Sequence, residues 1–197
     1  MATAGVLFAL YAAMALAETG GASKFIRGLG DQAIRVMQAQ QMPLDARETQ
    51  FRALLADGFD IDFISQFALG RAWQTATPEQ RSNYRQFFGE YILKVYSSRF
   101  GGYSGETLTI VSERAAGQQD TVVATRIDRP SAPPIAAEWR VRLAGNSYKI
   151  IDVMVEGISM AATQRSEFAA VVKRDGLDGL INMLDLRTSK ISATAAR

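Results

Sequence analysis

The sequence contains no cysteine and no histidine among its 197 residues. Without cysteine the chain has no disulfide, no catalytic thiol and no thiolate metal site, although this does not exclude an oxidising compartment. Without histidine it has no Ser-His-Asp or Cys-His catalysis, no imidazole acid–base chemistry and almost no route to zinc. We therefore expect neither a metal nor another cofactor.

Charge of either sign is also modest. The formal net charge is +2 and the sequence pI is about 9.0. The chain has no run of lysines or arginines and no nucleic-acid-binding motif, so no nucleic acid is expected as a partner. Hydrophobic residues make up 48% and charged residues 21%, which is ordinary for a globular protein. The length predicts one domain.

The N-terminal stretch has no charged residue before Glu18. Its apolar run, Gly5 to Ala17, is too short to span a bilayer comfortably. The run ends in Ala-Leu-Ala, a small-x-small pattern that is typical of a signal-peptide cleavage site. No lysine or arginine precedes it, which departs from the usual pattern, and a buried N-terminal helix is the alternative. We predict a signal peptide at residues 1–17, export to the periplasm, and one lipid-binding domain at residues 18–197.

The segment from Thr77 to Phe100 predicts one long helix. Thr77 and Gln80 are spaced as a capping box, and Pro78 suits the first helical position. Apolar residues then recur at steps of three and four, at Tyr84, Phe87, Phe88, Tyr91, Ile92, Val95 and Tyr96. This aromatic face either builds an ordinary core or forms one wall of an apolar ligand cavity.

Further helices are expected on both sides of this segment. Periodicity predicts helices at residues 25–40, 45–55 and 60–73, and the third is apolar around most of its circumference. Asp45 and Glu48 form a plausible capping pair for the second. After the strands, Ser159 can cap another helix, Asp175-Gly176 stops it, and a last helix begins near Asp178.

Between these helical segments the apolar period changes from 3.6 to 2. Four strands are predicted at residues 106–112, 121–128, 137–143 and 148–156, with a proline-rich loop at 129–134. Short links between consecutive strands predict an antiparallel meander. The expected fold class is therefore α+β, with helices covering one face of a four-stranded antiparallel sheet around a hollow.

Three motifs resemble one family when taken together and in order. They are LGRAWQTATPEQRSNYRQFFGEYILKVY at residues 69–96, IDVMVEGISMAATQRSEF at 151–168 and DGLDGLINML at 175–184. This set is similar to the MlaC family, also called toluene-tolerance proteins, and the resemblance covers residues 25–188. It implies an NTF2-like or cystatin-like α+β cone with a deep apolar cavity that accepts acyl tails and leaves the head group exposed.

The resemblance also implies a function and partners. Members of the family are periplasmic shuttles that carry phospholipid between an outer-membrane lipoprotein complex and an inner-membrane MCE-domain/ABC transporter. A hopanoid-associated branch shares this architecture, and the sequence does not separate the two ligands. Such a carrier needs no catalytic machinery.

The size of a lipid tail agrees with this expectation. A tail spans roughly 15 Å, half of a hydrocarbon core of ~30 Å, and a helix of about 24 residues is roughly 36 Å long. For any single wall residue, a packed core position without lipid contact is an equal alternative. The expected lipid-binding residues are Phe63, Phe67, Phe87, Phe88, Tyr91, Val95, Tyr96, Trp139, Val141, Val153 and Met154.

Two other groups of residues invite a functional interpretation. Asp152 and Glu156 are expected on one face of the last strand, where paired carboxylates suit the acid–base work of a small NTF2-like isomerase or hydratase. The alternative is a structural role as hydrogen-bonded or capping residues. Basic residues on two predicted helices either form a solvated surface or steer docking to an acidic partner or an anionic membrane. These are Arg81, Arg85, Lys94, Arg165, Lys173 and Arg174.

Overall fold

The computed structural model describes residues 20–97 and 103–195, with side chains as far as residue 189. The predicted signal peptide and the end of the long predicted helix, residues 98–100, lie outside this part of the chain. No helix in the described ranges is long and apolar enough to cross a membrane.

The described residues form an α+β fold, as predicted. The sheet is an antiparallel meander in the order β1-β2-β3-β4-β5, and its fifth strand has only two residues, which the sequence did not predict. The strands are β1 Thr107–Ala115, β2 Asp120–Arg129, β3 Ala132–Ala144, β4 Ser147–Val155 and β5 Ile158–Ser159. The helices are α1 Gly21–Gln38, α2 Leu44–Gly58, α3 Ile61–Leu69, α4 Ala72–Thr75, α5 Pro78–Ser97 and α6 Met160–Ala195.

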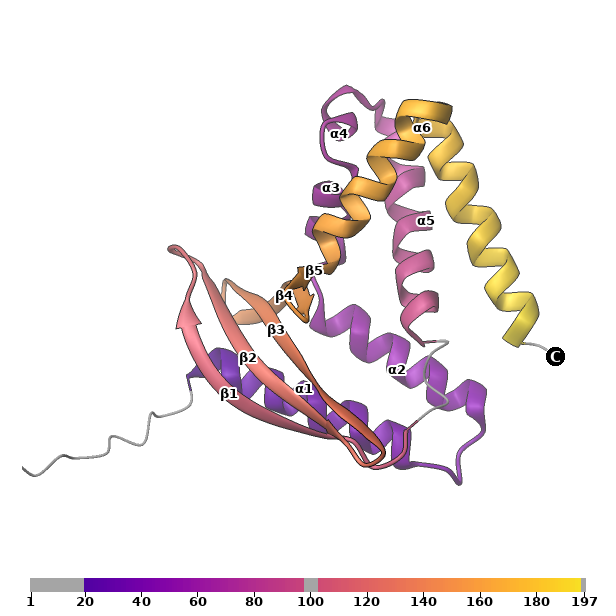
Figure 1. Cartoon of the computed structure of the whole chain (residues 1–197). Coiled ribbons are helices and arrows are strands. Elements are labelled where there is room, and N and C mark those ends of the chain that lie inside the picture. The colour runs from indigo at the N-terminus through magenta and orange to yellow at the C-terminus, as the bar shows by residue number, and fades with distance from the viewer. Residues whose placement is uncertain (1–19, 98–102, 196–197) are drawn as a thin grey trace, which may run out of the picture.

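The helices fall into two groups around the sheet (Figure 1). The first helix, α1, lies along one face of the curved sheet and contacts β1 and β2. Helices α3 to α6 gather beyond the β4 end of the sheet, and α2 links the groups through contacts with α1, α5 and β4. The chain between α2 and α3 is joined to β4 by one isolated parallel bridge, in which the Asp60 amide donates to the Ile150 carbonyl at 2.9 Å.

Short-range signals in the sequence set several helix ends. The predicted capping box is present, since the Gln80 amide donates to Thr77 Oγ1 and the Thr77 amide to Gln80 Oε1, each at 3.1 Å. Ser159 caps α6 as predicted, because its Oγ accepts from the Ala162 amide at 3.0 Å. Gly176 has a non-helical φ of 73°, and α6 bends there. The sequence predicts that the helix ends at this position.

The predicted capping of α2 by Asp45 and Glu48 is wrong. The residue before this helix is Pro43, and no side chain among the described residues caps the helix. Glu48 instead accepts a hydrogen bond from Ser97 Oγ at 3.1 Å and so ties α2 to the end of α5. The Glu48 carboxylate, which the local pattern predicts as a cap of α2, therefore forms a tertiary contact instead.

The predicted continuous helix over residues 60–73 is also wrong. The helix breaks at Gly70, which has φ 61° and ψ −127°. Residues other than glycine rarely adopt this backbone conformation. Two helices result, α3 and the single turn of α4. The start of α3 was predicted, and Asp60 caps it by accepting from the Phe63 amide at 2.9 Å.

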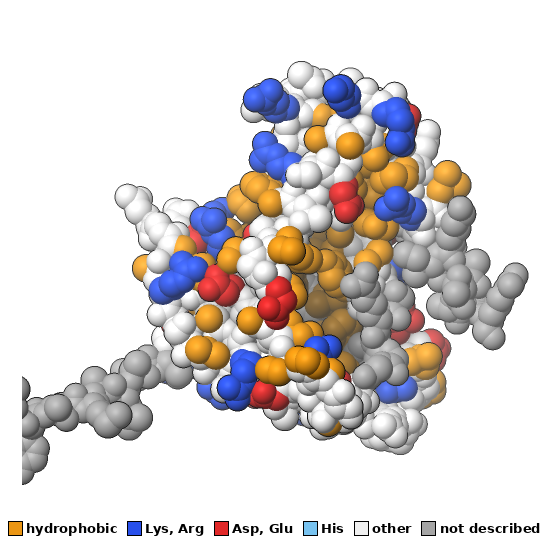
Figure 2. Space-filling model, viewed as in Figure 1, with side chains coloured by type: hydrophobic (Ala, Val, Ile, Leu, Met, Phe, Trp, Pro, Cys, Tyr) orange, Lys and Arg blue, Asp and Glu red, His pale blue; other side chains and the backbone are white. Residues whose placement is uncertain are grey.

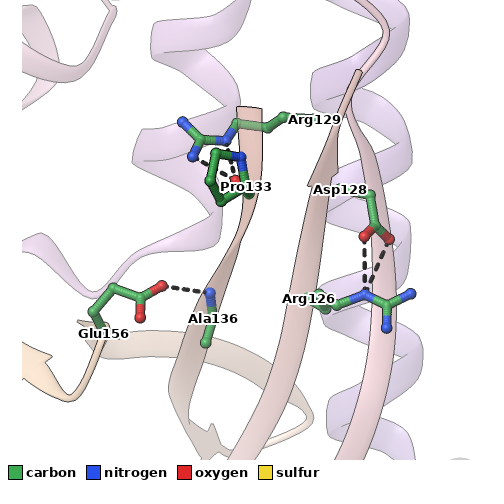
Figure 3. A network of polar contacts seen from close by, with 6 residues as sticks. All are labelled: Arg126, Asp128, Arg129, Pro133, Ala136 and Glu156. Carbon is green, nitrogen blue, oxygen red and sulfur yellow. Dashed lines mark hydrogen bonds and ion pairs between the residues drawn. The ribbon is translucent and has the colours of Figure 1, made fainter. Parts of the chain in front are cut away.

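The proline-rich segment is not the loop that the sequence predicted. Strand β3 begins at Ala132, so Pro133 and Pro134 lie in the strand. This part of β3 extends beyond β4, which pairs only from Ala137 onward. The absence of N–H groups on the two prolines therefore removes no hydrogen bond between β3 and β4. Arg129 Nε donates to the Pro133 carbonyl at 2.8 Å and closes the β2–β3 turn (Figure 3).

Candidate functional site

Most of the buried hydrophobic residues in the described part of the chain fall into two clusters. The helical cluster joins α3, α5 and α6, and its buried members are Ala68, Leu69, Tyr84, Phe88, Phe168, Leu180, Ile181 and Leu184. The sheet cluster joins α1 to one face of the sheet, and its buried members are Ala22, Ile26, Val123, Val141 and Ile150. A small globular domain usually has one contiguous core. Two distinct clusters in one domain are therefore unusual.

Large apolar side chains surround both clusters without being fully buried. Beside the sheet cluster these are Phe25, Leu29, Phe59, Leu108, Ile110, Trp139, Tyr148 and Val153, and beside the helical cluster they include Ile61, Phe87, Tyr91 and Ile92. Figure 2 shows hydrophobic side chains around a hollow between the sheet and the helices α2 and α5. This hollow is the candidate binding site, because exposed apolar surface in a concavity favours an apolar ligand.

The structure brings three of the predicted wall residues together on the sheet. Trp139 and Val153 face each other across β3 and β4, and both pack against the sheet cluster that contains Val141. The indole N–H of Trp139 donates to Thr125 Oγ1 at 2.9 Å, which fixes the ring. Met154 is the next residue of β4 and pairs with Glu138, so its side chain points to the opposite face of the sheet.

Three of the predicted wall residues of α5 belong to the helical cluster or pack against it. Phe88 is fully buried, with its ring 5.7 Å from that of Tyr84 and 6.1 Å from that of Phe168. Phe87 and Tyr91 pack on the same cluster and are half-buried. Val95 and Tyr96 lie one turn further along α5, and Tyr96 is 40% exposed.

Two predicted wall residues lie beneath arginines. The Arg142 guanidinium lies 4.5 Å from the centre of the Phe63 ring, and that of Arg165 lies 5.1 Å from the Phe67 ring. Both rings are on α3, which the structure places beside α6 and β4. Neither arginine contact was predicted from the sequence.

Sequence reasoning also missed a groove between α1 and α2. This open groove has a volume of about 590 Å³ and a mixed apolar and polar lining. The sequence contains part of the signal for this groove, because the apolar period of α1 is clear. No pattern of neighbouring residues indicates that α2 packs beside α1. The groove is lined by Gln32, Arg35, Val36, Ala39, Gln50, Ala53, Leu54 and Asp57.

The two carboxylates considered for acid–base chemistry both accept hydrogen bonds from backbone amides. Asp152 accepts from Ser159 Oγ at 2.6 Å and from the Ala161 amide at 3.1 Å, at the start of α6. Glu156 accepts from the Ala136 amide at 2.8 Å and has a φ of 49° (Figure 3). Because the left-handed turn at Glu156 breaks the strand alternation, the two residues serve different elements rather than one site.

A buried carboxylate ties the sheet to the helices. Asp120 accepts from Arg142 at 2.6 and 3.1 Å and from Arg140 at 2.8 Å. The hydrogen bond from Arg142 holds the pKa of Asp120 below its usual range, with Arg140 adding to the effect and burial opposing it. Arg142 also covers Phe63, so this cluster holds β2 and β3 against α3.

Asp120→Asn is expected to lower the free energy of unfolding by about 2 kcal/mol at neutral pH. The folded pKa of Asp120 is depressed, so its stabilisation is present above the unfolded pKa of about 3.9 and is lost as pH falls through the folded pKa. The difference from wild type should therefore shrink below about pH 4, measured by urea unfolding. Asp128→Asn, which alters an exposed pair with Arg126 (Figure 3), should cost less than about 1 kcal/mol. A pH-independent difference for Asp120→Asn would contradict this assignment.

The fold and the site together define an α+β protein with a divided core and an apolar hollow between its sheet and helices. The chain belongs to the MlaC family, because the family's profile, described as MlaC protein, matches residues 27–185. The resemblance read from the three motifs is thereby confirmed.

Individual relatives agree with this assignment. The chain is 22% identical over 168 residues to the intermembrane phospholipid transport system binding protein MlaC of Haemophilus influenzae, covering 81% of this chain and 78% of that protein. It is 22% identical over 151 residues to the toluene tolerance protein ttg2D of Pseudomonas putida, covering 76% and 70%. The fold matches a phospholipid-binding protein of Ralstonia solanacearum, solved with a phospholipid, with a TM-score of 0.75, 24% identity and coverage of 86% of this chain and 97% of that one.

Proposed function

We propose that this chain is a periplasmic carrier that holds the acyl tails of a phospholipid in the hollow between the sheet and the helices. The observation that carries the proposal is the division of the interior into two clusters, with large half-buried apolar side chains beside both. A bound tail would bury this surface. The names of the relatives support a phospholipid as the ligand, and a hopanoid is the alternative within the family.

The energetics favour an enclosed ligand. Apolar surface contributes about 0.8 kcal/mol for each methylene removed from water. Two tails with some ~28 methylenes would cost on the order of 20 kcal/mol if they crossed water uncovered. A carrier therefore has to cover the tails and needs no reacting group. The hydrogen-bonded roles of Asp152 and Glu156 support binding rather than catalysis.

The wider system belongs to the same proposal. Residues 1–17 would direct export, and the mature chain would begin near Glu18. The partners would be an outer-membrane lipoprotein complex that exchanges lipid with the carrier and an inner-membrane MCE-domain/ABC transporter. The relative from Haemophilus influenzae, named for an intermembrane phospholipid transport system, supports this placement.

Protein purified without detergent is expected to release lipid on extraction with organic solvent. Mass spectrometry of the extract would identify the head group and tails, which distinguishes phospholipid from hopanoid. Lipid-free protein should take up the same lipid from vesicles in an exchange assay. Protein that carries no lipid and acquires none from vesicles would overturn the proposed function.

A further inference from the structure

Three arginines of the helical group stack on aromatic rings, and a fourth, Arg71, directly follows Gly70 in the chain. We call this surface the arginine platform and define it as Arg71, Arg81, Arg85 and Arg165 together with the rings of Phe67 and Trp73. Its residues come from α3, from α4 and the residue before it, and from the N-terminal halves of α5 and α6. Figure 2 shows basic side chains gathered over the end of the molecule where α4 and the bend of α6 lie.

Two arginines of α5 stack on one indole. The guanidinium carbons of Arg81 and Arg85 lie 5.3 and 4.8 Å from the centre of the Trp73 ring. Arg81 is also held by the end of α4, because its Nε donates to the Trp73 carbonyl at 3.0 Å and its Nη2 to the Gln74 carbonyl at 3.2 Å. These contacts fix the planar groups before any partner arrives, which lowers the entropy cost of binding.

A third arginine is held by a ring of α3. Arg165 lies over the ring of Phe67, which is 37% exposed. Its Nε is also 3.0 Å from where a Cβ on Gly70 would stand, so the glycine leaves room for the guanidinium. A side chain at position 70 would therefore displace the Arg165 guanidinium, and Arg71 is the next residue along the chain.

The platform has little internal charge compensation. In the described part of the chain, its single ion pair joins Arg85 Nε to Asp62 Oδ1 at 3.8 Å, and the two side chains are 43% and 75% exposed. Arg71 and Arg165 form no ion pair within the described residues. Exposed cations without a carboxylate partner favour an anionic ligand.

We propose that the arginine platform docks an acidic segment of a partner protein, whose carboxylates pair with the exposed guanidinium edges. Four arginines favour bidentate carboxylate recognition, for which lysine is unsuited. A membrane fits less well, because the guanidinium groups cover Trp73 and Phe67 and so hinder the aromatic rings from anchoring in a bilayer interface. The proposal deepens the carrier function and rests on it, since a shuttle must dock on the proteins it serves.

The test uses the full mature chain and a fluorescent decaglutamate peptide, with binding followed by anisotropy at low and high ionic strength. Arg71→Glu/Arg165→Glu should weaken peptide binding about tenfold or more at low salt. The matched control is Lys24→Glu/Arg27→Glu on exposed positions of α1, which makes the same change in net charge. This control should weaken binding less than about threefold, because it changes only the long-range field.

A second variant separates geometry from charge. Arg81→Lys/Arg85→Lys keeps both charges but loses the planar fork, and it should also weaken peptide binding. Equal losses in the two charge-reversal pairs, or no peptide binding by wild type at low salt, would overturn the proposal. Binding of anionic phosphatidylglycerol vesicles that depends on the platform, with no such dependence for the peptide, would overturn it in favour of a membrane. Lipid content of the same samples reports on the carrier function separately, and it should not change in any of these variants.

Discussion

Phe88→Ala is expected to lower the free energy of unfolding by about 3–5 kcal/mol without changing the lipid bound per folded molecule. Phe88 is fully buried, and its ring meets Phe168 nearly edge-on, at an interplanar angle of 85°. Truncation would leave a cavity in the helical cluster and remove two aromatic contacts. Urea unfolding and lipid-to-protein ratio in the same preparation would measure both effects.

Phe87→Ala is the matched control for this experiment. Phe87 is the preceding residue of α5 and is half-buried at the edge of the same cluster. Its loss should cost less stability, about 1–2 kcal/mol, because less apolar area leaves contact. A Phe88→Ala protein that is as stable as wild type but has lost its lipid would show that Phe88 lines the ligand rather than the core.

The sequence predicts best what depends on neighbouring residues. Thr77 and Gln80 are three residues apart, so their reciprocal capping bonds require only that the local helix form. The same is true of Ser159 at the start of α6. Alternating and helical periods identify the order of the elements for a similar reason, because each period reflects which side of one element is buried.

The failures arise where a distant contact decides the outcome. Glu48 binds Ser97, which lies 49 residues away, and so does not cap its own helix. Gly70 lies inside the apolar helix predicted over residues 60–73, although its conformation breaks that helix beside Arg165. Pro133 and Pro134 suggested a loop, because the sequence does not show that β3 extends beyond its neighbour.

The site was predicted only in outline for a related reason. Periodicity shows that α5 has an apolar face, but it does not show what covers that face. In the structure, Phe168 and Leu184 of α6 pack on this face. Some of the predicted wall residues of α5 are therefore buried in the core, and others lie half-buried at its edge. Trp139 and Val153 were easier to group, because cross-strand pairing follows from the hairpin between β3 and β4.

Val153→Asp is expected to reduce the lipid bound per folded molecule about tenfold or more, because a carboxylate without a partner against acyl tails costs several kcal/mol. Val153 is half-buried beside Trp139 on the sheet cluster, so the new carboxylate would meet the proposed tails. The matched control is Val111→Asp, the same change on strand β1 at a position that is 64% exposed. This control should keep the lipid content of wild type.

The measurement is extracted lipid per folded molecule by mass spectrometry, with folding checked by near-ultraviolet circular dichroism and by elution as a single species. Val153→Trp provides a second route that adds volume instead of charge and should also displace lipid. Trp139 reports on the same site, since its fluorescence should shift when lipid is removed from wild type and stay unchanged when lipid is offered to Val153→Asp. If folded Val153→Asp and Val153→Trp both carry as much lipid as Val111→Asp, the sheet side of the hollow does not hold the tails.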